Sequence, residues 1–216
     1  MTSATPDPVP SRRERRRREL HERILESAVA LFEHTGFEGT TALEIANSAD
    51  VAEKTFYNHF PTKQHLIEEL AERSLQSSTE LLAEARRLPG TTAECLKRFA
   101  DCTADTLEQG SRQMIREVLL ELVRVAQVGG IRPDRKRALH HAFRALLEDG
   151  AARGDIAPGC DFEFVTDLAV AAYLGIIINW VTLPDYPLRE RLRRAAEAGA
   201  EILKHWVPPP TEMRGR

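Results

Sequence analysis

Five polar side chains between residues 54 and 59 could together contact DNA. Lysine and protonated histidine pair with phosphate, the hydroxyls of threonine and tyrosine donate to phosphate oxygens, and the amide of asparagine pairs with adenine. On the exposed face of a short helix, such side chains would meet a duplex as a group. We therefore expect DNA contacts from the following residues: Lys54, Thr55, Tyr57, Asn58 and His59.

Positive charge is concentrated ahead of this segment, between Arg12 and Arg18. Six of those seven residues are arginine, and only Glu14 interrupts them. The whole chain of 216 residues has a formal net charge of −3, so its overall balance does not indicate a nucleic-acid partner. The local run has two interpretations, a solvated basic tail or a short arm that contacts the DNA backbone or minor groove.

The elements around the polar side chains are predicted to be two short helices that pack around a tight turn. Thr41 followed by Glu44 is a capping box, which indicates the start of the first helix. Asp50 and Val51 form the turn, and Pro61 breaks the chain after the second helix. The interior would consist of small and apolar residues, namely Leu43, Ile45, Ala46, Ala49, Val51 and Phe56. Taken alone, this pattern also fits a solvated helical hairpin.

The rest of the chain has the pattern of an all-α protein. Apolar residues recur at helical spacing in nearly every segment, and Gly and Pro separate the segments into about nine helices. The Pro-rich residues 1–11 are predicted to be a disordered tail. Residues 12–66 are predicted to form a three-helix domain with a helix-turn-helix at about 41–60, and residues 67–216 a larger helical domain.

Between residues 20 and 70, a series of positions carries a family likeness. They are Gly36-Phe37, Thr40-Thr41, Ile45-Ala46, Ala49, Val51, Thr55-Phe56-Tyr57, His59-Phe60, Lys63 and Leu66. In order and spacing, they resemble the DNA-binding domain of the tetracycline-repressor (TetR) family. Two positions differ, because Asp50 stands where glycine is common and Ala52 where a capping serine is frequent. Asp tolerates a left-handed backbone, and we expect Asp50 to take over the capping.

The resemblance implies roles for individual side chains. Tyr57 and His59 would hold phosphates on either side of the major groove, and Lys63 would clamp the DNA backbone. Thr41 would contact phosphate from the N-terminus of its helix, where the amide dipoles favour an anion. The remaining side chains of the group would face bases or their nearest phosphates, namely Lys54, Thr55 and Asn58.

The resemblance also favours the second interpretation of the arginine run, an arm that reaches DNA. The arginines predicted to make contact are Arg16, Arg17 and Arg18. The implied partner is double-stranded operator DNA, bound by a homodimer in which each subunit places one recognition helix in the major groove.

The two last helical segments are predicted to form the dimer interface. Residues 162–183 are apolar nearly all the way round, so one side would pack on the subunit's own core and the other on a partner. The last helix has a narrower apolar stripe with arginines opposite, and two copies of both helices would make a four-helix interface. The predicted interface residues are Ile177, Trp180, Val181, Leu192, Ala196, Gly199 and Leu203.

A pocket for an effector would lie among the middle helices of residues 67–216. Its candidate lining residues are Phe99, Cys102, Met114, Val118, Phe143, Tyr173 and Asn179, with plain core packing as the alternative for each. Asn179 stands out because an amide within an apolar run needs a hydrogen-bond partner. A small lipophilic effector would then move the recognition helices away from the spacing of about 34–36 Å that one DNA turn requires.

Other function classes find less support in the sequence. No nucleophile–base spacing, Gly-rich phosphate loop or metal-ligand run indicates an enzyme, a metal site or a cofactor. The three cysteines are too few for a disulfide framework, and the N-terminus holds no apolar segment, so we expect a cytoplasmic protein without a membrane span. The alternatives left open are a constitutive regulator or activator with the same DNA-binding domain, and a helical scaffold for protein partners.

Overall fold

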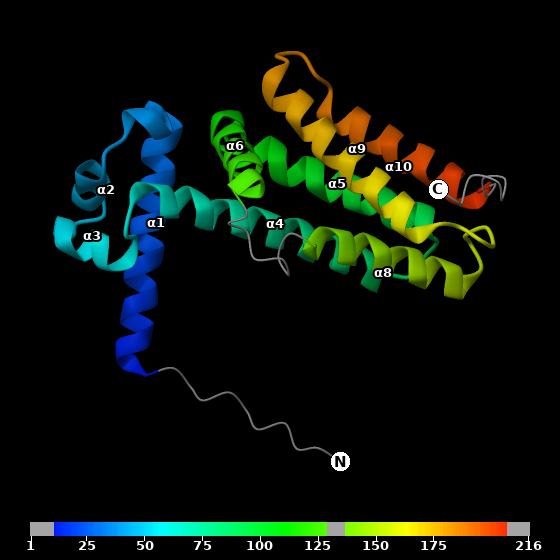
Figure 1. The fold of residues 1–216 in the computed structure, drawn as a ribbon, viewed down its shortest axis with the longest axis horizontal. Helices are drawn as coiled ribbons and strands as arrows, with labels where there is room; N and C mark the ends of the chain where they lie inside the picture. Colours follow the sequence, from blue (N-terminus) through cyan, green and yellow to red (C-terminus); the bar gives the residue numbers. More distant parts are fainter. Residues whose placement is uncertain (1–10, 129–136, 207–216) are drawn as a thin grey trace. The chain divides into compact units, whose positions relative to one another are not determined.

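The structure, a computed structural model, describes residues 11–128 and 137–206 (Figure 1). These ranges hold nine helices and no strand, which confirms the prediction of an all-α fold of about nine helices. The predicted tail at residues 1–11 lies outside the described residues except for Ser11. The chain divides into two compact units, Met1–Ile67 and Glu68–Arg216.

The first unit contains three complete helices, and its first helix begins earlier than the apolar stripe suggests. Ser11 and Glu14 form a capping box at the start of this helix, so the arginine run is helical. The helices are α1 (Arg12–Gly39), α2 (Ala42–Ser48) and α3 (Glu53–His59).

A buried glycine and a group of aromatic residues shape this unit. Gly36 has φ 77° and ψ 165°, a backbone conformation that glycine adopts far more readily than any residue with a side chain. The helical path of α1 is broken there. Phe32, Phe56 and Phe60 are at most 2% exposed, and the ring of His21 on α1 stacks on Phe60 directly after α3, with centroids 4.4 Å apart.

Helix α4 (Lys63–Arg87) begins in the first unit and continues into the second. The second unit adds five described helices: α5 (Thr92–Gln109), α6 (Arg112–Val128), α8 (Ala138–Arg153), α9 (Phe162–Thr182) and α10 (Leu188–Lys204). Side chains cap three of them. Thr91 and Glu94 form a capping box for α5, Ser111 accepts from the Met114 amide at the start of α6, and Asp161 accepts from the Phe164 amide at the start of α9.

The core of the second unit lies between α5, α8, α9 and α10, which pack side by side in Figure 1. Its centre is aromatic, since the ring centroid of Phe99 lies 5.6 Å from that of Phe143 and 5.4 Å from that of Tyr173. Helix α10 packs most extensively along α5, and Leu188, Leu192 and Ala196 provide its buried contacts.

Helix α9 exposes much of its apolar surface. Within the described residues it is the helix long and apolar enough to cross a membrane by length and composition, and 33% of its most apolar window is buried. Three of its large apolar side chains, Phe164, Leu168 and Ile178, are 42–55% exposed. A contiguous apolar surface of this kind marks a binding face, because water solvates it poorly.

Candidate functional site

Helix α3 presents the predicted DNA-contacting side chains on the surface of the first unit. Its apolar face is anchored by Phe56, which is fully buried, and by Phe60 directly after the helix. Lys54, Tyr57 and Asn58 are exposed, whereas Thr55 and His59 are half-buried. All five lie within one helix of seven residues, so the structure brings them together as a group.

The turn before α3 is formed as predicted, but the capping is not. Asp50 has φ 51°, which confirms that it occupies the left-handed region where the family commonly has glycine. Helix α3 has Ala52 at its N-cap and no side-chain hydrogen bond there, so the expectation that Asp50 caps the helix is wrong. The helix begins with a backbone hydrogen bond, in which the Thr55 amide donates to the Ala52 carbonyl at 2.7 Å.

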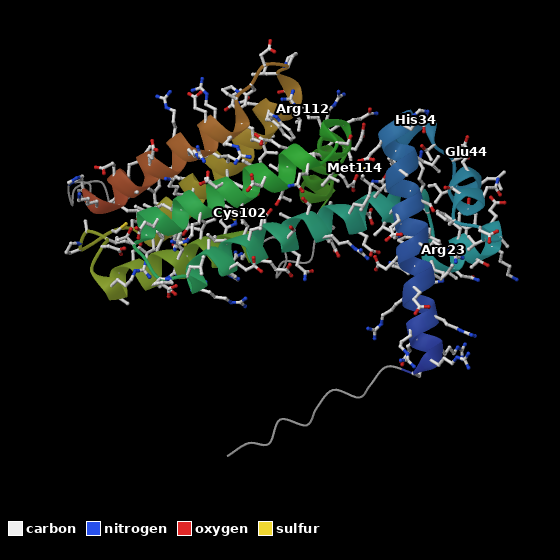
Figure 2. The ribbon with its side chains drawn as sticks, turned by 180° about the vertical axis from the view of Figure 1, so that it is seen from behind. Arg23, His34, Glu44, Cys102, Arg112 and Met114 are labelled. Carbon is white, nitrogen blue, oxygen red and sulfur yellow. The ribbon has the colours of Figure 1, made fainter. Side chains whose placement is uncertain are left out.

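Thr41 has partners within its own helix end. Its hydroxyl accepts from the Glu44 amide at 3.2 Å and donates to Glu44 Oε2 at 2.8 Å, which confirms the capping box. The hydrogen bonds from the Thr41 backbone and hydroxyl lower the pKa of Glu44, which Figure 2 labels on α2. The start of α2 therefore already holds an anion, and a phosphate contact from Thr41 would have to compete with that carboxylate.

Lys63 is also engaged inside the protein. Its Nζ donates to the carbonyl oxygens of Phe37 and Thr40, at 2.5 Å and 2.9 Å, and lies 4.2 Å from the centroid of the Phe37 ring. The side chain is half-buried. In this structure the ammonium ties the start of α4 to Phe37 near the end of α1 and to Thr40 directly after it, while the predicted contact of Lys63 with the DNA backbone stays a prediction.

The surroundings of His59 disfavour its charged form. Burial lowers the pKa of His59 below its ordinary value, and the neighbouring His21 and Arg17 lower it further. The ring of His21 lies 5.6 Å from that of His59 and stacks on Phe60 at 4.4 Å. In the absence of DNA, these surroundings favour the neutral form of His59 over the imidazolium.

The predicted arginine contacts lie on the first turns of α1. Arg16, Arg17 and Arg18 are exposed and helical, as is Arg23 further along the same helix, which Figure 2 labels. Their helical backbone contrasts with the expected short arm. A helix with six arginines in its first seven residues presents positive charge around its whole circumference.

The second unit contains an apolar cavity of about 270 Å³ between α5, α8, α9 and α10. Three of the predicted pocket residues, Phe99, Phe143 and Tyr173, line it. The Tyr173 hydroxyl lies 3.0 Å from the Ser78 hydroxyl on α4. Burial raises the pKa of Tyr173, so its hydroxyl remains protonated.

Four other predicted pocket residues do not line this cavity. Cys102, labelled on α5 in Figure 2, and Asn179 are exposed, so the Asn179 amide needs no internal partner. Met114 and Val118 are buried on α6, away from the lining. The prediction of these four as lining residues is wrong for this cavity, because helical periodicity does not show which buried side chains border a space.

Residues 24–70 match the family model described as "Bacterial regulatory proteins, tetR family". Over a longer stretch of 168 residues, the chain is 31% identical to the uncharacterized HTH-type transcriptional regulator YvkB of Bacillus subtilis, covering 78% of this chain and 86% of YvkB. The likeness therefore extends through both units. The chain belongs to the TetR family. It is a DNA-binding transcriptional regulator.

Solved structures of TetR-family regulators share its fold. One is the transcriptional repressor FadR of Thermus thermophilus in complex with lauroyl-CoA, with a TM-score of 0.62 and 22% identity over 88% of this chain and 97% of FadR. Another is the SmeT–triclosan complex, with a TM-score of 0.69 and 18% identity over 89% of this chain and 96% of SmeT. At sequence identities of 22% and 18%, these two structures show only that the fold is shared.

Most of the residues predicted for the TetR-family dimer interface face the core of their own subunit. Five of them are at most 9% exposed and belong to the subunit's own core, namely Ile177, Trp180, Leu192, Ala196 and Leu203. Val181 and Gly199 are half-buried. Because α9 is apolar on every side, its sequence pattern does not distinguish the core face from the outer face.

The outer face of α9 and α10 carries a different set of residues, which the predicted interface did not include. Along α9 they alternate four and three apart, and all are exposed except the half-buried Gly175: Phe164, Leu168, Ala171, Gly175, Ile178 and Thr182. This is the spacing of a helix seam that packs against another helix. On α10, Ala195, Ala198 and Ile202 continue the face. We call these residues of α9 and α10 the outer seam; the heptad spacing was the available signal.

Proposed function

We propose that this regulator is a repressor that binds operator DNA as a homodimer and is released by a small lipophilic effector. The observation that carries the DNA-binding part is the geometry of α3. Phe56 anchors the helix in the core, and Lys54, Tyr57 and Asn58 project into solvent within two turns. A helix held in this way can enter the major groove without rearranging the unit.

Some side chains of α3 are proposed to contact bases and others to contact phosphates. Asn58 and Lys54 are exposed and have the donors that base edges and phosphates accept, and Thr55 contributes a hydroxyl. Tyr57 donates its hydroxyl to a phosphate. The ring N–H of His59 donates to a phosphate. The negative charge of that phosphate favours protonation of the ring.

The basic start of α1 provides non-specific affinity. Arg16, Arg17 and Arg18 are exposed, so they can neutralise phosphates and release counterions. Thr41 and Lys63 act indirectly, since their hydrogen bonds hold the start of α2 and the end of α1 in place.

The homodimer forms through the outer seam. Phe164, Leu168 and Ile178 on α9 and Ile202 on α10 are 41–55% exposed, and a second copy of the same face would bury them. A twofold axis presents identical surfaces to each other, and the two helices from each subunit then make a four-helix interface. This assembly covers the apolar surface of α9 in a cytoplasmic protein, without a membrane.

The effector part of the proposal rests on the apolar cavity. Two proteins with this fold were solved with small molecules, FadR with lauroyl-CoA and SmeT with triclosan. The Tyr173 hydroxyl connects the cavity lining to Ser78 on α4. Occupation of the cavity would act through α4, which begins beside α3, on the separation of the two recognition helices.

The experiment is a binding titration of DNA from upstream of the protein's own gene, followed by fluorescence anisotropy. Tyr57→Ala removes a phosphate contact from both half-sites and is expected to weaken binding about tenfold or more. His34→Ala is the control, because His34 is exposed on α1 outside the proposed interface. Equal affinity of Tyr57→Ala and the wild type, with helicity unchanged, would favour the scaffold alternative.

A further inference from the structure

The start of α2 exposes a large apolar side chain. Leu43 is 50% exposed, so its predicted place in the interior of the helix-turn-helix is wrong. The buried residues of α2 are Ile45 and Ala46, and the turn of about 100° per residue directs Leu43 nearly opposite to Ile45. In the described part of the first unit, the other large apolar side chain with comparable exposure is Tyr57 on α3, at 45%. Each helix of the motif therefore presents one such side chain to solvent.

Hydrogen bonds on both sides of Leu43 fix the first turn of α2. The Thr41 amide donates to Glu44 Oε2 at 2.7 Å, and the Glu44 amide donates to the Thr41 hydroxyl at 3.2 Å. The bonds from Thr41 lower the pKa of Glu44, so its carboxylate is charged and occupies the positive end of the helix dipole. This negative charge would repel a DNA phosphate. The contact available to Leu43 is therefore one with an uncharged, apolar group.

The major groove of DNA offers one apolar group of this kind. In a helix-turn-helix, the second helix enters the groove while the first crosses the DNA backbone beside it. Helix α2 packs directly against α3, so its exposed start would lie at the rim of the groove that α3 enters. Among the base edges in that groove, thymine alone carries a methyl group, at C5. A leucine at the rim would remove this methyl group from water.

We infer that Leu43 contacts the C5-methyl group of an operator thymine and is a specificity-determining residue of this regulator. The inference rests on the proposed binding of operator DNA through α3, and it adds a residue of α2 and the base that this residue recognises. Removing one methyl group from water changes a binding constant about fourfold. With one contact in each half-site, the expected preference for thymine over uracil is on the order of tenfold.

The test replaces thymine by uracil, which pairs with adenine in the same way and lacks only the methyl group. The DNA from upstream of the protein's own gene is synthesised once with thymidine and once with deoxyuridine, and both fragments are titrated by fluorescence anisotropy. The wild type is expected to bind the uracil fragment about tenfold more weakly. Single substitutions at each thymine should then locate the difference at one position in each half-site.

Variants of Leu43 assign the methyl contact to this side chain. Leu43→Ala removes the contact and leaves the capping of α2 intact. It should bind thymine DNA about tenfold more weakly than the wild type, and DNA with uracil at the located positions equally well within about twofold. Leu43→Met retains an apolar side chain and should retain the preference for thymine. Leu88→Ala is the matched control and should behave like the wild type, because Leu88 is 57% exposed and lies outside the helix-turn-helix.

Each other outcome overturns the inference at a defined point. Equal weakening of the wild type and Leu43→Ala by uracil would show that another side chain contacts the methyl group. Equal binding of the two fragments by the wild type would show that no methyl group is contacted. A Leu43→Met protein without a preference, at unchanged helicity, would contradict an apolar contact. A wild type that binds neither fragment would refute the proposed function together with this contact, which distinguishes that failure from the other three.

Discussion

At the scale of single residues, His59 shows how local surroundings set the role of a side chain. It ends the helix that carries the proposed DNA contacts, and it is half-buried beside His21 and Arg17. Burial removes water from a positive ring and the neighbours repel it, so its pKa is lowered. A DNA phosphate near the ring would raise the pKa of His59, because its negative charge stabilises the protonated form.

This difference predicts that operator binding takes up protons at His59. The pKa of His59 is lowered in the free protein and higher beside a phosphate, so affinity should rise as the pH falls from about 7.5 to about 6. Anisotropy titrations across that range would measure it. His59→Gln should show a shallower pH dependence, and equal slopes in the two proteins would contradict the assignment.

The lowered pKa of His59 has the opposite consequence for the stability of the free protein, which should fall as the pH falls. The unfolded chain has the ordinary histidine pKa, which is higher than that of His59 in the fold, so the unfolded state binds more protons. The contribution of His59 is therefore complete above the ordinary pKa and is lost progressively as the pH falls from there through the lowered pKa that His59 has in the fold. Binding and stability should thus respond to acid in opposite directions.

At the scale of elements, a hydrogen bond between α9 and α4 connects the cavity to the helix shared with the DNA-binding unit. The hydroxyls of Tyr173 and Ser78 lie 3.0 Å apart, and Ser78 also donates to the Ser74 carbonyl at 3.1 Å. Tyr173 lines the cavity with its ring and reaches α4 with its hydroxyl. A molecule that displaces the ring would therefore disturb α4.

A double-mutant cycle would measure this contact. Tyr173→Phe, Ser78→Ala and the double variant should give a coupling energy of about 1 kcal/mol in urea unfolding, the usual contribution of a partly buried hydrogen bond. Tyr186→Phe combined with Ser78→Ala is the control, since no hydrogen bond joins those two hydroxyls, and its coupling should be near zero. Additivity in the first cycle would mean that the hydroxyl pair does not connect the helices energetically.

At the scale of the whole molecule, the assembly depends on how closely two copies of α9 approach. Gly175 lies near the middle of the outer seam, and a Cβ built on it meets no atom within 4 Å in the single subunit. Glycine in the middle of a helix costs up to about 1 kcal/mol relative to alanine, so an open position gains nothing from it within the subunit. A partner helix that packs against this position would account for it.

Gly175→Leu is therefore expected to weaken dimerisation at least tenfold and to reduce operator binding at low protein concentration. Gly175→Ala adds one methyl group and raises the helix propensity, so it should keep the monomer as stable or make it more stable. Sedimentation equilibrium and thermal unfolding would separate the two effects. A Gly175→Leu protein that dimerises like the wild type would exclude α9 from the interface near this residue.

Much of this organisation is readable in the sequence because it is local. The capping box at Thr41, the break at Gly36 and the left-handed turn at Asp50 depend on backbone geometry within a few residues. The helix periodicity and the order of motifs around α3 then suffice to predict an all-α regulator with an exposed recognition helix.

Tertiary packing decided the rest, because the residues concerned have more than one possible partner. In the sequence, nothing near Lys63 indicates a partner within the protein. The fold brings the carbonyls of Phe37 and Thr40, which lie 26 and 23 residues away along the chain, within hydrogen-bond distance of its ammonium. Leu192 and Ile177 are apolar whether they face the core or a partner, and only the packing of α10 on α5 and of α9 on the core assigns them to the interior. The hydrophobic effect is non-directional. The apolar pattern of a helix therefore does not show which of its two apolar faces packs against the same chain and which packs against a partner.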